Sequence, residues 1–493
     1  MSSVEHVCMS IAAGAGDGPV SVTIPSDANR CHYQGDQAGH SPVGMTAPLS
    51  PSHHIDPALL DQARVEMGCD GVPGIALGVY HNGCAATAGL GVTNVLHPQP
   101  VDGDTLFQIA SITKTFTATA VLQLVEQGRL NLDDTIRAHL PEFTVADPDV
   151  STSVTIRDCL VHSCGWEGDF FEDTGWSDDA LAAMVARMDK LVQVTPLGRM
   201  WSYSNSAFYV LGRILEVLHG RSYEDVLDEA LLAPLGMDGA CFFARDLLHR
   251  KFAVGHAERG GQTVIARPWA MPRCVNPSGG VVASAAHLMR YAHFQLDGAP
   301  VLGDAMRLAA FEPAGPSSDT PAIGLGWWLD DSAGERVVSH TGGANGQPCS
   351  FAMIPSRRFA LAVLTNGANG WITAQRLLAW AMQTYFSLAA PDLRAQPRAD
   401  VDAWLGTYET RTERRVLRRE GERHVLDQTP LKQWLDGLDP PALPQLGTEI
   451  QPTGPGAMLF APGKRAQRVG TVLRNGHGEI RWLRVNRRAA LRK

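Results

Sequence analysis

An α+β fold is predicted for most of this 493-residue chain: an antiparallel sheet flanked by helices, followed by a small antiparallel β-barrel. Strand-like segments lie near both ends of the first 390 residues, and the stretch between them is mostly helical. Both ends would therefore contribute strands to one sheet. After residue 390 the pattern changes to short strands separated by turn residues, which is typical of a small barrel.

Composition divides the chain into three regions. Residues 1–54 are rich in Gly, Ser, Pro, Asp and His without periodicity, and we expect them to form a flexible leader. Residues 55–390 are expected to hold the sheet and its helices, and residues 391–493 the barrel, with PDLRAQPRAD as the linker.

The first ordered element is expected to be a helix over IDPALLDQARVEMG, in which Asp56 can cap the first turn. Two strands, VPGIALGVY and CAATAGLGVT, then surround a tight Asn82-Gly83 turn. A strong helix follows, because apolar residues recur on one face, and Gly128 stops it. Helices are expected at 109–128, 177–190, 204–219, 222–233, 284–296 and 371–388, and strands at 324–329, 336–343, 350–356 and 359–366.

In the barrel region the segments WLGTYETR, RVLRREG, RHVLDQ, AMLFAP, RVGTVLRNGHGEIRWLRV and AALRK are the expected strands. The Asn475-Gly476 pair marks the clearest hairpin.

Charge is uneven along the chain. The whole chain carries 42 Lys and Arg against 51 Asp and Glu, a net charge of −9. Residues 391–493 carry 19 against 12, or +7, so the preceding part carries −16. Because the arginines alternate with apolar residues, as in IRWLRV, they indicate the solvated faces of strands. We therefore expect no nucleic-acid binding.

Several classes of protein are excluded by what the sequence lacks. No apolar run reaches the ~18 residues that a membrane helix needs. The N-terminus has no Lys or Arg before Arg30, and the nine cysteines are scattered without CxxC pairs. Neither a Walker nor a dinucleotide fingerprint is present. The sequence favours a cytoplasmic protein that needs no membrane, metal or cofactor.

Ser111 and Lys114 stand three residues apart at the start of the 109–128 helix. As isolated features they would be a helix-capping serine and a surface lysine. Helical spacing also brings the two side chains together, and a desolvated lysine can then accept the proton of the hydroxyl. We expect Ser111 both to cap the helix and to act as a nucleophile.

Two further motifs follow. MWSYSNSAFYVLG places Tyr203 and Asn205 before a helix, and SHTGGANG places His340 on a strand that ends in glycines. Each motif alone would be structural. In this order the three resemble the serine β-lactamase and penicillin-binding-protein superfamily, in its class C-like branch. The landmarks TIRDCLVHSCGW, LLAPLGM and PSGGVVASAAHLMRY lie between them, and the resemblance covers residues 55–390.

The resemblance implies a role for each motif residue. Ser111 would be the acylated nucleophile, Lys114 would take its proton or tune Tyr203, and Tyr203 would relay protons to the leaving group. Asn205 would orient Lys114 and the substrate amide. The remaining members are the catalytic His340, the backbone N–H groups of Ser111 and Gly343 as the oxyanion hole, and Thr341 and Gly342 as substrate-binding residues.

His340 departs from the commoner family pattern, which has lysine at this position. Because histidine is mostly neutral at pH 7, it would hold a substrate carboxylate less firmly than lysine does. This weakens the case for a β-lactamase or DD-peptidase. Members with H-x-G include D-aminopeptidases, esterases and the penicillin-binding-protein-type thioesterases that cyclise nonribosomal peptides.

The C-terminal region resembles the lipocalin-like barrel of several such members. In the peptide-cyclising thioesterases an arginine near the C-terminus of that barrel is thought to reach the active site. Arg488 is the best positional match and Arg487 the second; both could instead simply border the last strand. A guanidinium at the site would suit a peptide carboxylate.

We therefore expect a serine acyl-enzyme acting on peptidyl substrates, most specifically a thioesterase that releases and cyclises a nonribosomal peptide. Its partners would be a peptidyl thioester, amide or ester and a carrier protein of a peptide synthetase. A D-aminopeptidase or general esterase or amidase is the alternative. A non-catalytic peptide-binding sensor is the alternative from another class.

Overall fold

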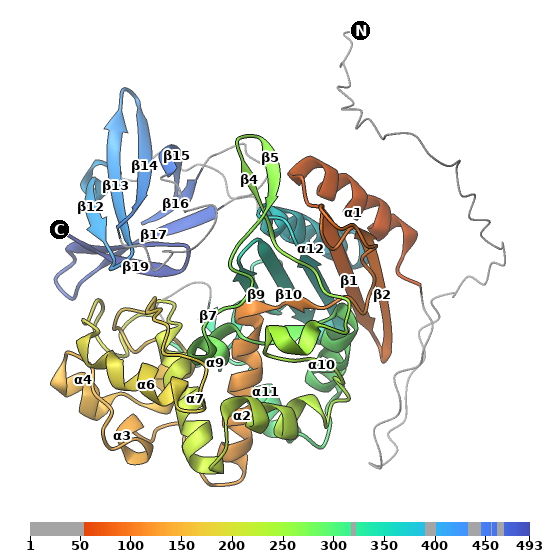
Figure 1. Ribbon diagram of the computed structural model, residues 1–493. Helices are drawn as coiled ribbons and strands as arrows, with labels where there is room; N and C mark the ends of the chain where they lie inside the picture. Colours follow the sequence, from red (N-terminus) through yellow and green to blue (C-terminus); the bar gives the residue numbers. More distant parts are fainter. Residues whose placement is uncertain (1–53, 317–321, 390–400, 432–444, 455, 461–467) are drawn as a thin grey trace, which may run out of the picture. The chain divides into compact units, whose positions relative to one another are not determined.

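The computed structural model describes residues 54–316, 322–389, 401–431, 445–454, 456–460 and 468–493 (Figure 1). The expected leader, apart from its last residue, and the expected linker at 391–400 lie outside the described residues. The division of the chain into domains at these two places therefore stays a prediction.

The predicted α+β fold is confirmed by a seven-stranded antiparallel sheet. Strand β1 pairs with β11, with Ile75 opposite Thr365, so residues nearly 300 positions apart share the centre of the sheet. Both ends of this region therefore build the sheet, as predicted. In spatial order the strands are β2 (Cys84–Gly91), β1 (Gly74–His81), β11 (Phe359–Thr365), β10 (Gln347–Ile354), β9 (Val337–Ala344), β8 (Trp328–Asp330) and β7 (Ala322–Ile323).

Helices cover both faces of this sheet (Figure 1). On one face α1 (Pro57–Asp70) and α12 (Gly370–Phe386) pack together over a core that includes Leu59 and Leu377. On the other face α10 (Ala285–Asp297) contacts β1 and β11. The side chain of Asp56 accepts a hydrogen bond from the N–H of Ala58, so this residue caps α1 as predicted.

The helical middle of the chain encloses the largest buried core. Its helices are α2 (Thr113–Glu126), α3 (Ile136–His139), α4 (Pro148–Ser153), α5 (Ile156–Leu160), α6 (Ala180–Ala186), α7 (Ser206–His219), α8 (Tyr223–Leu227), α9 (Asn276–Gly279) and α11 (Asp304–Ala309). Two small ribbons, β3 (Phe107–Gln108) with β6 (Val282–Ala283) and β4 (His256–Arg259) with β5 (Gln262–Ile265), complete it. Among the described helices, none combines the length and apolarity that crossing a bilayer requires.

The C-terminal strands form a closed antiparallel barrel, as predicted. The first strand closes on the last, with Tyr408 opposite Arg492. Its strands are β12 (Gly406–Glu409), β13 (Glu413–Glu420), β14 (Arg423–Pro430), β15 (Gln445–Gly454), β16 (Ala457–Phe460), β17 (Arg468–Arg474), β18 (Ile480–Val485) and β19 (Arg488–Arg492). Of these, β15 was not predicted.

The strand predicted over 324–329 is wrong in its first half. Gly326 has φ of +81° and donates its N–H to the carbonyl of Leu160, so the chain turns there instead of extending. Glycine adopts this backbone region at little cost. The turn separates two short strands, β7 and β8.

The last barrel strands are joined by two kinds of turn. The hairpin predicted at Asn475-Gly476 is present between β17 and β18, with Asn475 accepting bonds from the N–H groups of His477 and Glu479. The tight two-residue turn is instead the next one, Asn486–Arg487, which joins β18 to β19. Both residues have positive φ, +49° and +67°, although neither is glycine.

Candidate active site

Ser111 lies in a 3₁₀ turn, Ala110–Ile112, directly before α2. The expectation that it caps the helix is wrong: the cap positions of the turn and of α2 are Ile109 and Ile112, and neither helix start has a side-chain cap. Ala110 has φ of +46°, a region that side chains with a Cβ rarely adopt. Such strain is common at functional sites.

Lys114 is fully buried beside it. Its Nζ lies 3.2 Å from Ser111 Oγ, 2.7 Å from Asn205 Oδ1 and 2.6 Å from the carbonyl oxygen of Ser278. Burial lowers the pKa of Lys114 well below its ordinary value; the nearby Arg488 lowers it further, and Asp169 opposes the shift.

These contacts fix how a neutral Lys114 must be oriented. The Asn205 amide oxygen and the Ser278 carbonyl can only accept, so they take the two N–H bonds of the amine. The lone pair is then left for the Ser111 hydroxyl. This is the arrangement in which a lysine can take the proton of a serine.

Tyr203 lies in the extended segment before α7, with its ring stacked on Trp328 and tilted against His162. Its hydroxyl hydrogen-bonds Ser111. Burial raises the pKa of Tyr203 to about 12, while the bond to Ser111 and the charges of the two barrel arginines, Arg488 and Arg487, limit the rise. Tyr203 is therefore a neutral phenol that can donate or accept a proton.

Asn205 stands at the N-cap position of α7 and links Lys114 to Asp169. Its Oδ1 accepts from Lys114, and its Nδ2 donates to Oδ1 of Asp169 at 2.8 Å. The two partners define which way the amide points.

His340 lies on β9, buried, at the position where the sequence placed it. Its Nδ1 lies 2.8 Å from the Thr341 carbonyl, so that nitrogen carries the proton and Nε2 carries a lone pair. Among the described residues Nε2 has no hydrogen-bond partner. Burial, and then the charges of Lys114 and Arg487, lower the pKa of His340 well below its ordinary value, so the ring is neutral.

The glycines of β9 bring this strand against the nucleophile. A Cβ on Gly342 would overlap the carbonyl oxygen of Ile109 and press on Ala110. By contrast, Gly343 is exposed and has open space on its Cβ side, and Thr341 is exposed. Gly342 thus permits the close approach that would place a β9 amide next to Ser111.

The barrel contributes two cations to this region. The guanidinium of Arg488 lies 4.9 Å from the centre of the Tyr203 ring, and that of Arg487 lies 3.9 Å from the centre of the Trp328 ring. Arg488 Nη2 donates to Asp169 Oδ1 at 3.0 Å, and its Nε also bonds this carboxylate. Burial alone would lower the pKa of Arg488, but Asp169 raises it, whereas burial lowers the pKa of Arg487 to about 10.

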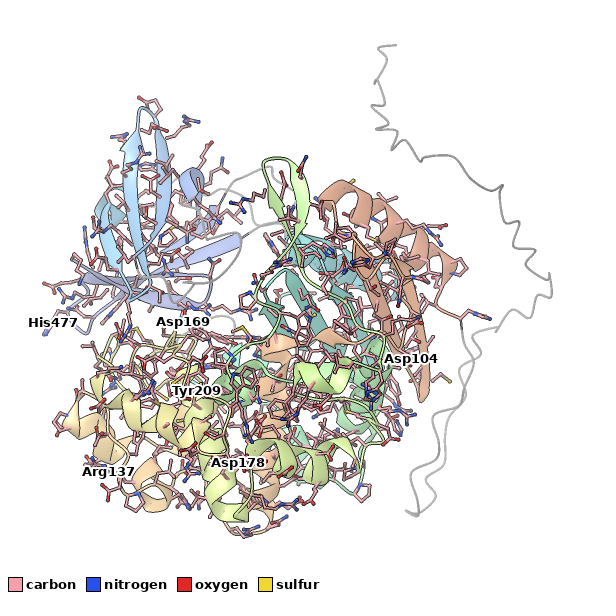
Figure 2. The ribbon with its side chains drawn as sticks, viewed as in Figure 1. Asp104, Arg137, Asp169, Asp178, Tyr209 and His477 are labelled. Atoms are coloured by element: carbon pink, nitrogen blue, oxygen red, sulfur yellow. The ribbon has the colours of Figure 1, made fainter. Side chains whose placement is uncertain are left out.

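Asp169 is labelled in Figure 2 and was not identified from the sequence, nor were His162, Ser278 and Trp328. An aspartate in GDFFED carries no motif, and a carbonyl partner such as that of Ser278 has no sequence signature. His162 has φ of +58° and its Nδ1 accepts the N–H of Ser204, which a sequence pattern does not reveal.

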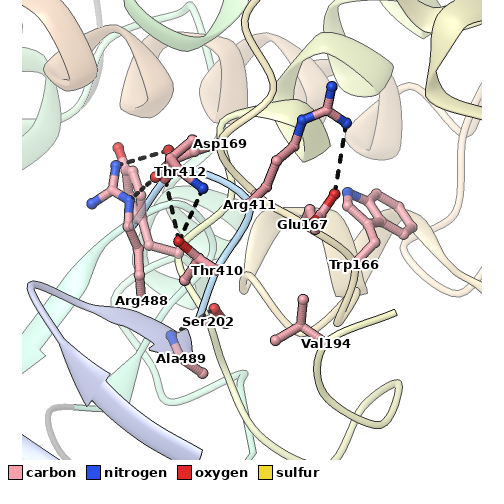
Figure 3. A pocket seen from close by; sticks show the side chains of 12 residues that line it. Trp166, Glu167, Asp169, Val194, Ser202, Thr410, Arg411, Thr412, Arg488 and Ala489 are labelled. Carbon is pink, nitrogen blue, oxygen red and sulfur yellow. Dashed lines mark hydrogen bonds and ion pairs between the residues drawn. The ribbon is translucent and has the colours of Figure 1, made fainter. Parts of the chain in front are cut away.

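Figure 3 shows a crevice between the barrel and the segment that contains Asp169, with Arg488 against Asp169 and Arg411 against Glu167. The free volume of this crevice is only about 20 Å³, which is room for about one water molecule. It is therefore a seam between two packed surfaces and not a substrate pocket. Its lining is Trp166, Glu167, Gly168, Asp169, Val194, Ser202, Tyr203, Thr410, Arg411, Thr412, Arg488 and Ala489.

Comparisons with known proteins show to which family this chain is similar. A family model described as beta-lactamase matches residues 62–383. Penicillin-binding protein 4 of Amycolatopsis lactamdurans is 34% identical over 355 residues, which cover 69% of this chain and 93% of that protein.

Two solved structures of SurE, one of them with D-Leu, have TM-scores of 0.69 and 0.67 and 24% identity. Each match covers 88% of this chain, and 98% and 99% of SurE. At this identity the likeness concerns the fold. The first 390 of the 493 residues make up less than 88% of the chain, so the matched part must include residues of the barrel. The shared fold therefore extends into the barrel.

Proposed function

This chain belongs to the beta-lactamase family of serine hydrolases, and we propose that it forms an acyl-enzyme at Ser111. The observation that carries the proposal is the bonding of Lys114. Asn205 and Ser278 take both N–H bonds of the buried amine, and its lone pair faces the hydroxyl of Ser111. A buried amine without acceptor partners would have no such orientation.

In the first step Ser111 Oγ bonds the substrate carbonyl carbon while its proton passes to Lys114. The backbone N–H groups of Ser111 and Gly343 would stabilise the oxyanion, and one such donor is worth ~3–4 kcal/mol of barrier. As the bond to the leaving group breaks, Tyr203 delivers a proton to that group. An amine or water then bonds the acyl carbon and gives its proton to Tyr203, the ester bond to Ser111 breaks, and the hydroxyl regains its proton from Lys114.

The substrate class we propose is a peptidyl thioester that the enzyme releases and cyclises. The neutral His340 supports this class over β-lactams and cell-wall peptides, because it offers a lone pair where lysine offers a cation. The fold shared with SurE includes the barrel, and D-Leu is bound in one SurE structure, so we propose a D-configured acyl residue. Arg488, which lies over Tyr203 and is paired with Asp169, would bring a guanidinium close to a peptide carboxylate. The donor of the thioester would be a carrier protein.

One experiment tests the acyl-enzyme. A fluorophosphonate probe should label the wild-type protein at Ser111 and leave Ser111→Ala unlabelled, with both proteins folded by circular dichroism. If the probe labels neither protein, or labels both, the proposal fails.

A second experiment tests the acceptor. The protein is incubated with a linear peptidyl thioester that ends in a D-residue, and the product is weighed by mass spectrometry. Loss of the thiol without gain of water means cyclisation. Gain of one water means hydrolysis and would favour the esterase or peptidase alternative.

A further inference from the structure

Asp169 connects the barrel to the catalytic side chains. Its Oδ1 accepts from Asn205 Nδ2 at 2.8 Å and from Arg488 Nη2 at 3.0 Å, while Arg488 Nε bonds the same carboxylate. Asp169 and Arg488 are 319 positions apart in the chain. The route from Ser111 through Lys114, Asn205 and Asp169 to Arg488 is therefore an unbroken series of polar contacts.

The contact is well shielded. The side chain of Asp169 is 13% exposed and that of Arg488 is 32% exposed. Charges in such a place are screened less than surface charges, so each acts on a neighbouring titratable group. The backbone of its partner Arg488 is also fixed, because the buried Arg415 donates from Nη1 to the Arg488 carbonyl oxygen at 2.7 Å.

We propose that Asp169 is a positioning residue with two tasks: it orients the Asn205 amide toward Lys114, and it balances the charge that Arg488 brings to the site. The inference rests on the proposed function in that Lys114 is taken as the proton acceptor for Ser111. Without Asp169, the uncompensated cation of Arg488 would lower the pKa of Lys114 further and make the neutral amine a weaker base toward Ser111.

The direction of the electrostatic effects agrees with this role. Arg488 lowers the pKa of Lys114 and Asp169 raises it. The other titratable groups near the site come from four elements: Tyr203 before α7, His162 after α5, His340 on β9, and Arg487 on the barrel turn. His162 and His340 both have lowered pKa values because they are buried, so they carry no charge near neutral pH.

The test is the rate at which a fluorophosphonate labels Ser111, measured against pH. Labelling should slow as pH falls through the pKa of Lys114. Asp169→Asn keeps the shape of the side chain and removes its negative charge. The slow limb of the profile, the range of low pH in which labelling falls off, should therefore move to lower pH. Arg488→Met removes the positive charge and should move the limb to higher pH. The double variant should return toward the wild-type position. Well below the wild-type midpoint, a single shift of about half a pKa unit should change the rate about threefold, since the neutral fraction of Lys114 changes there by a factor of about ten per unit.

Arg487→Met is the matched control. It is the adjacent arginine on the same turn, but its guanidinium lies on Trp328, and the charges that shift the pKa of Lys114 are those of Arg488 and Asp169. Its limb should stay in place. A second variant, Asp169→Leu, cannot hold the Asn205 amide and should slow labelling at every pH.

The outcomes separate this inference from the proposed function. No labelling of wild type overturns the proposed function. Labelling with an unmoved limb in Asp169→Asn, or one that moves in the same direction as in Arg488→Met, overturns the role of Asp169. Should Asp169→Asn not fold, an equal limb position in Arg488→Met and Arg487→Met overturns it instead.

Discussion

The backbone N–H of Tyr203 donates a hydrogen bond to the carbonyl oxygen of Arg487, 2.8 Å away. The acceptor belongs to the turn between the last two barrel strands, where Arg487 has φ of +67°. Such a conformation costs about 1 kcal/mol or more for a residue with a side chain, so the surrounding contacts must hold it. The barrel therefore takes part in placing the candidate proton relay.

Other contacts along the same seam support this arrangement. Ala489 N donates to Ser202 Oγ at 3.1 Å, and Arg484 Nη1 donates to the Trp201 carbonyl oxygen at 3.1 Å. Trp482 packs on Met200 and donates from Nε1 to the Val194 carbonyl oxygen at 2.7 Å. The segment that leads to Tyr203 is thus bound to the barrel over several consecutive residues.

Trp482→Ala should loosen this seam and reduce activity without touching the catalytic side chains. Loss of a buried tryptophan costs ~3–5 kcal/mol, and the Val194 carbonyl would lose its partner. We expect a lower free energy of unfolding in denaturant titration and slower labelling of Ser111 by a fluorophosphonate. Trp176→Ala is the control, because Trp176 is 51% exposed and surface changes usually stay within ~0.5 kcal/mol. Equal stability and labelling of the two variants would contradict the role of the seam.

Gly342→Ala should damage the site although it adds a single methyl group. The new Cβ would overlap the Ile109 carbonyl, a backbone atom that cannot move without shifting the turn of Ser111. Overpacking of this kind costs ~1–3 kcal/mol, and β9 would move away from the nucleophile. Thermal unfolding and the labelling rate measure the two effects.

The matched control for this change is Gly343→Ala on the next residue. Its Cβ would meet open space, and the substitution keeps the backbone N–H proposed for the oxyanion hole. This variant should fold and label like wild type. If the two alanine variants have the same stability and labelling rate, the close approach of Gly342 to Ile109 does not position strand β9.

Much of the fold was predictable because it depends on local patterns. Apolar periodicity and turn residues predicted the central strands, the long helices and the barrel, and the Asn82-Gly83 turn has the positive φ values expected for it. The spacing of Ser111 and Lys114 predicted their contact, because it depends only on helix geometry.

What the sequence did not predict depends on contacts between distant segments. The strained backbone at Ala110, next to Ser111, has no residue signature. The turn at Asn486–Arg487 lacks the glycine that marks tight hairpins, so Asn475-Gly476 was the stronger signal. Asp169 acquires its role only through partners 36 and 319 residues away.

Tyr203→Phe should separate proton transfer from packing. The ring contacts with Trp328 and His162 are kept, so the free energy of unfolding should change little. Without the hydroxyl no proton reaches the leaving group, and turnover of a peptidyl thioester should fall ~10²–10⁴-fold, the usual range for a general acid or base. Stopped-flow and steady-state measurements on the same substrate check this. A variant with unchanged turnover would exclude Tyr203 as the relay.

His340 should make the protein less stable in mild acid. Its folded-state pKa lies well below its ordinary value because of burial, so between that pKa and about 6.5 the unfolded chain binds a proton that the folded protein does not. Stability is then highest above about pH 6.5 and falls as pH drops, by at most ~1.4 kcal/mol per pH unit for one histidine. His340→Asn keeps a donor toward the Thr341 carbonyl and removes the titration. Denaturant titrations from pH 8 to pH 5 should therefore show a shallower loss of stability in this variant than in wild type. Equal slopes would mean that folding does not lower the pKa of His340, and the buried neutral ring would be contradicted.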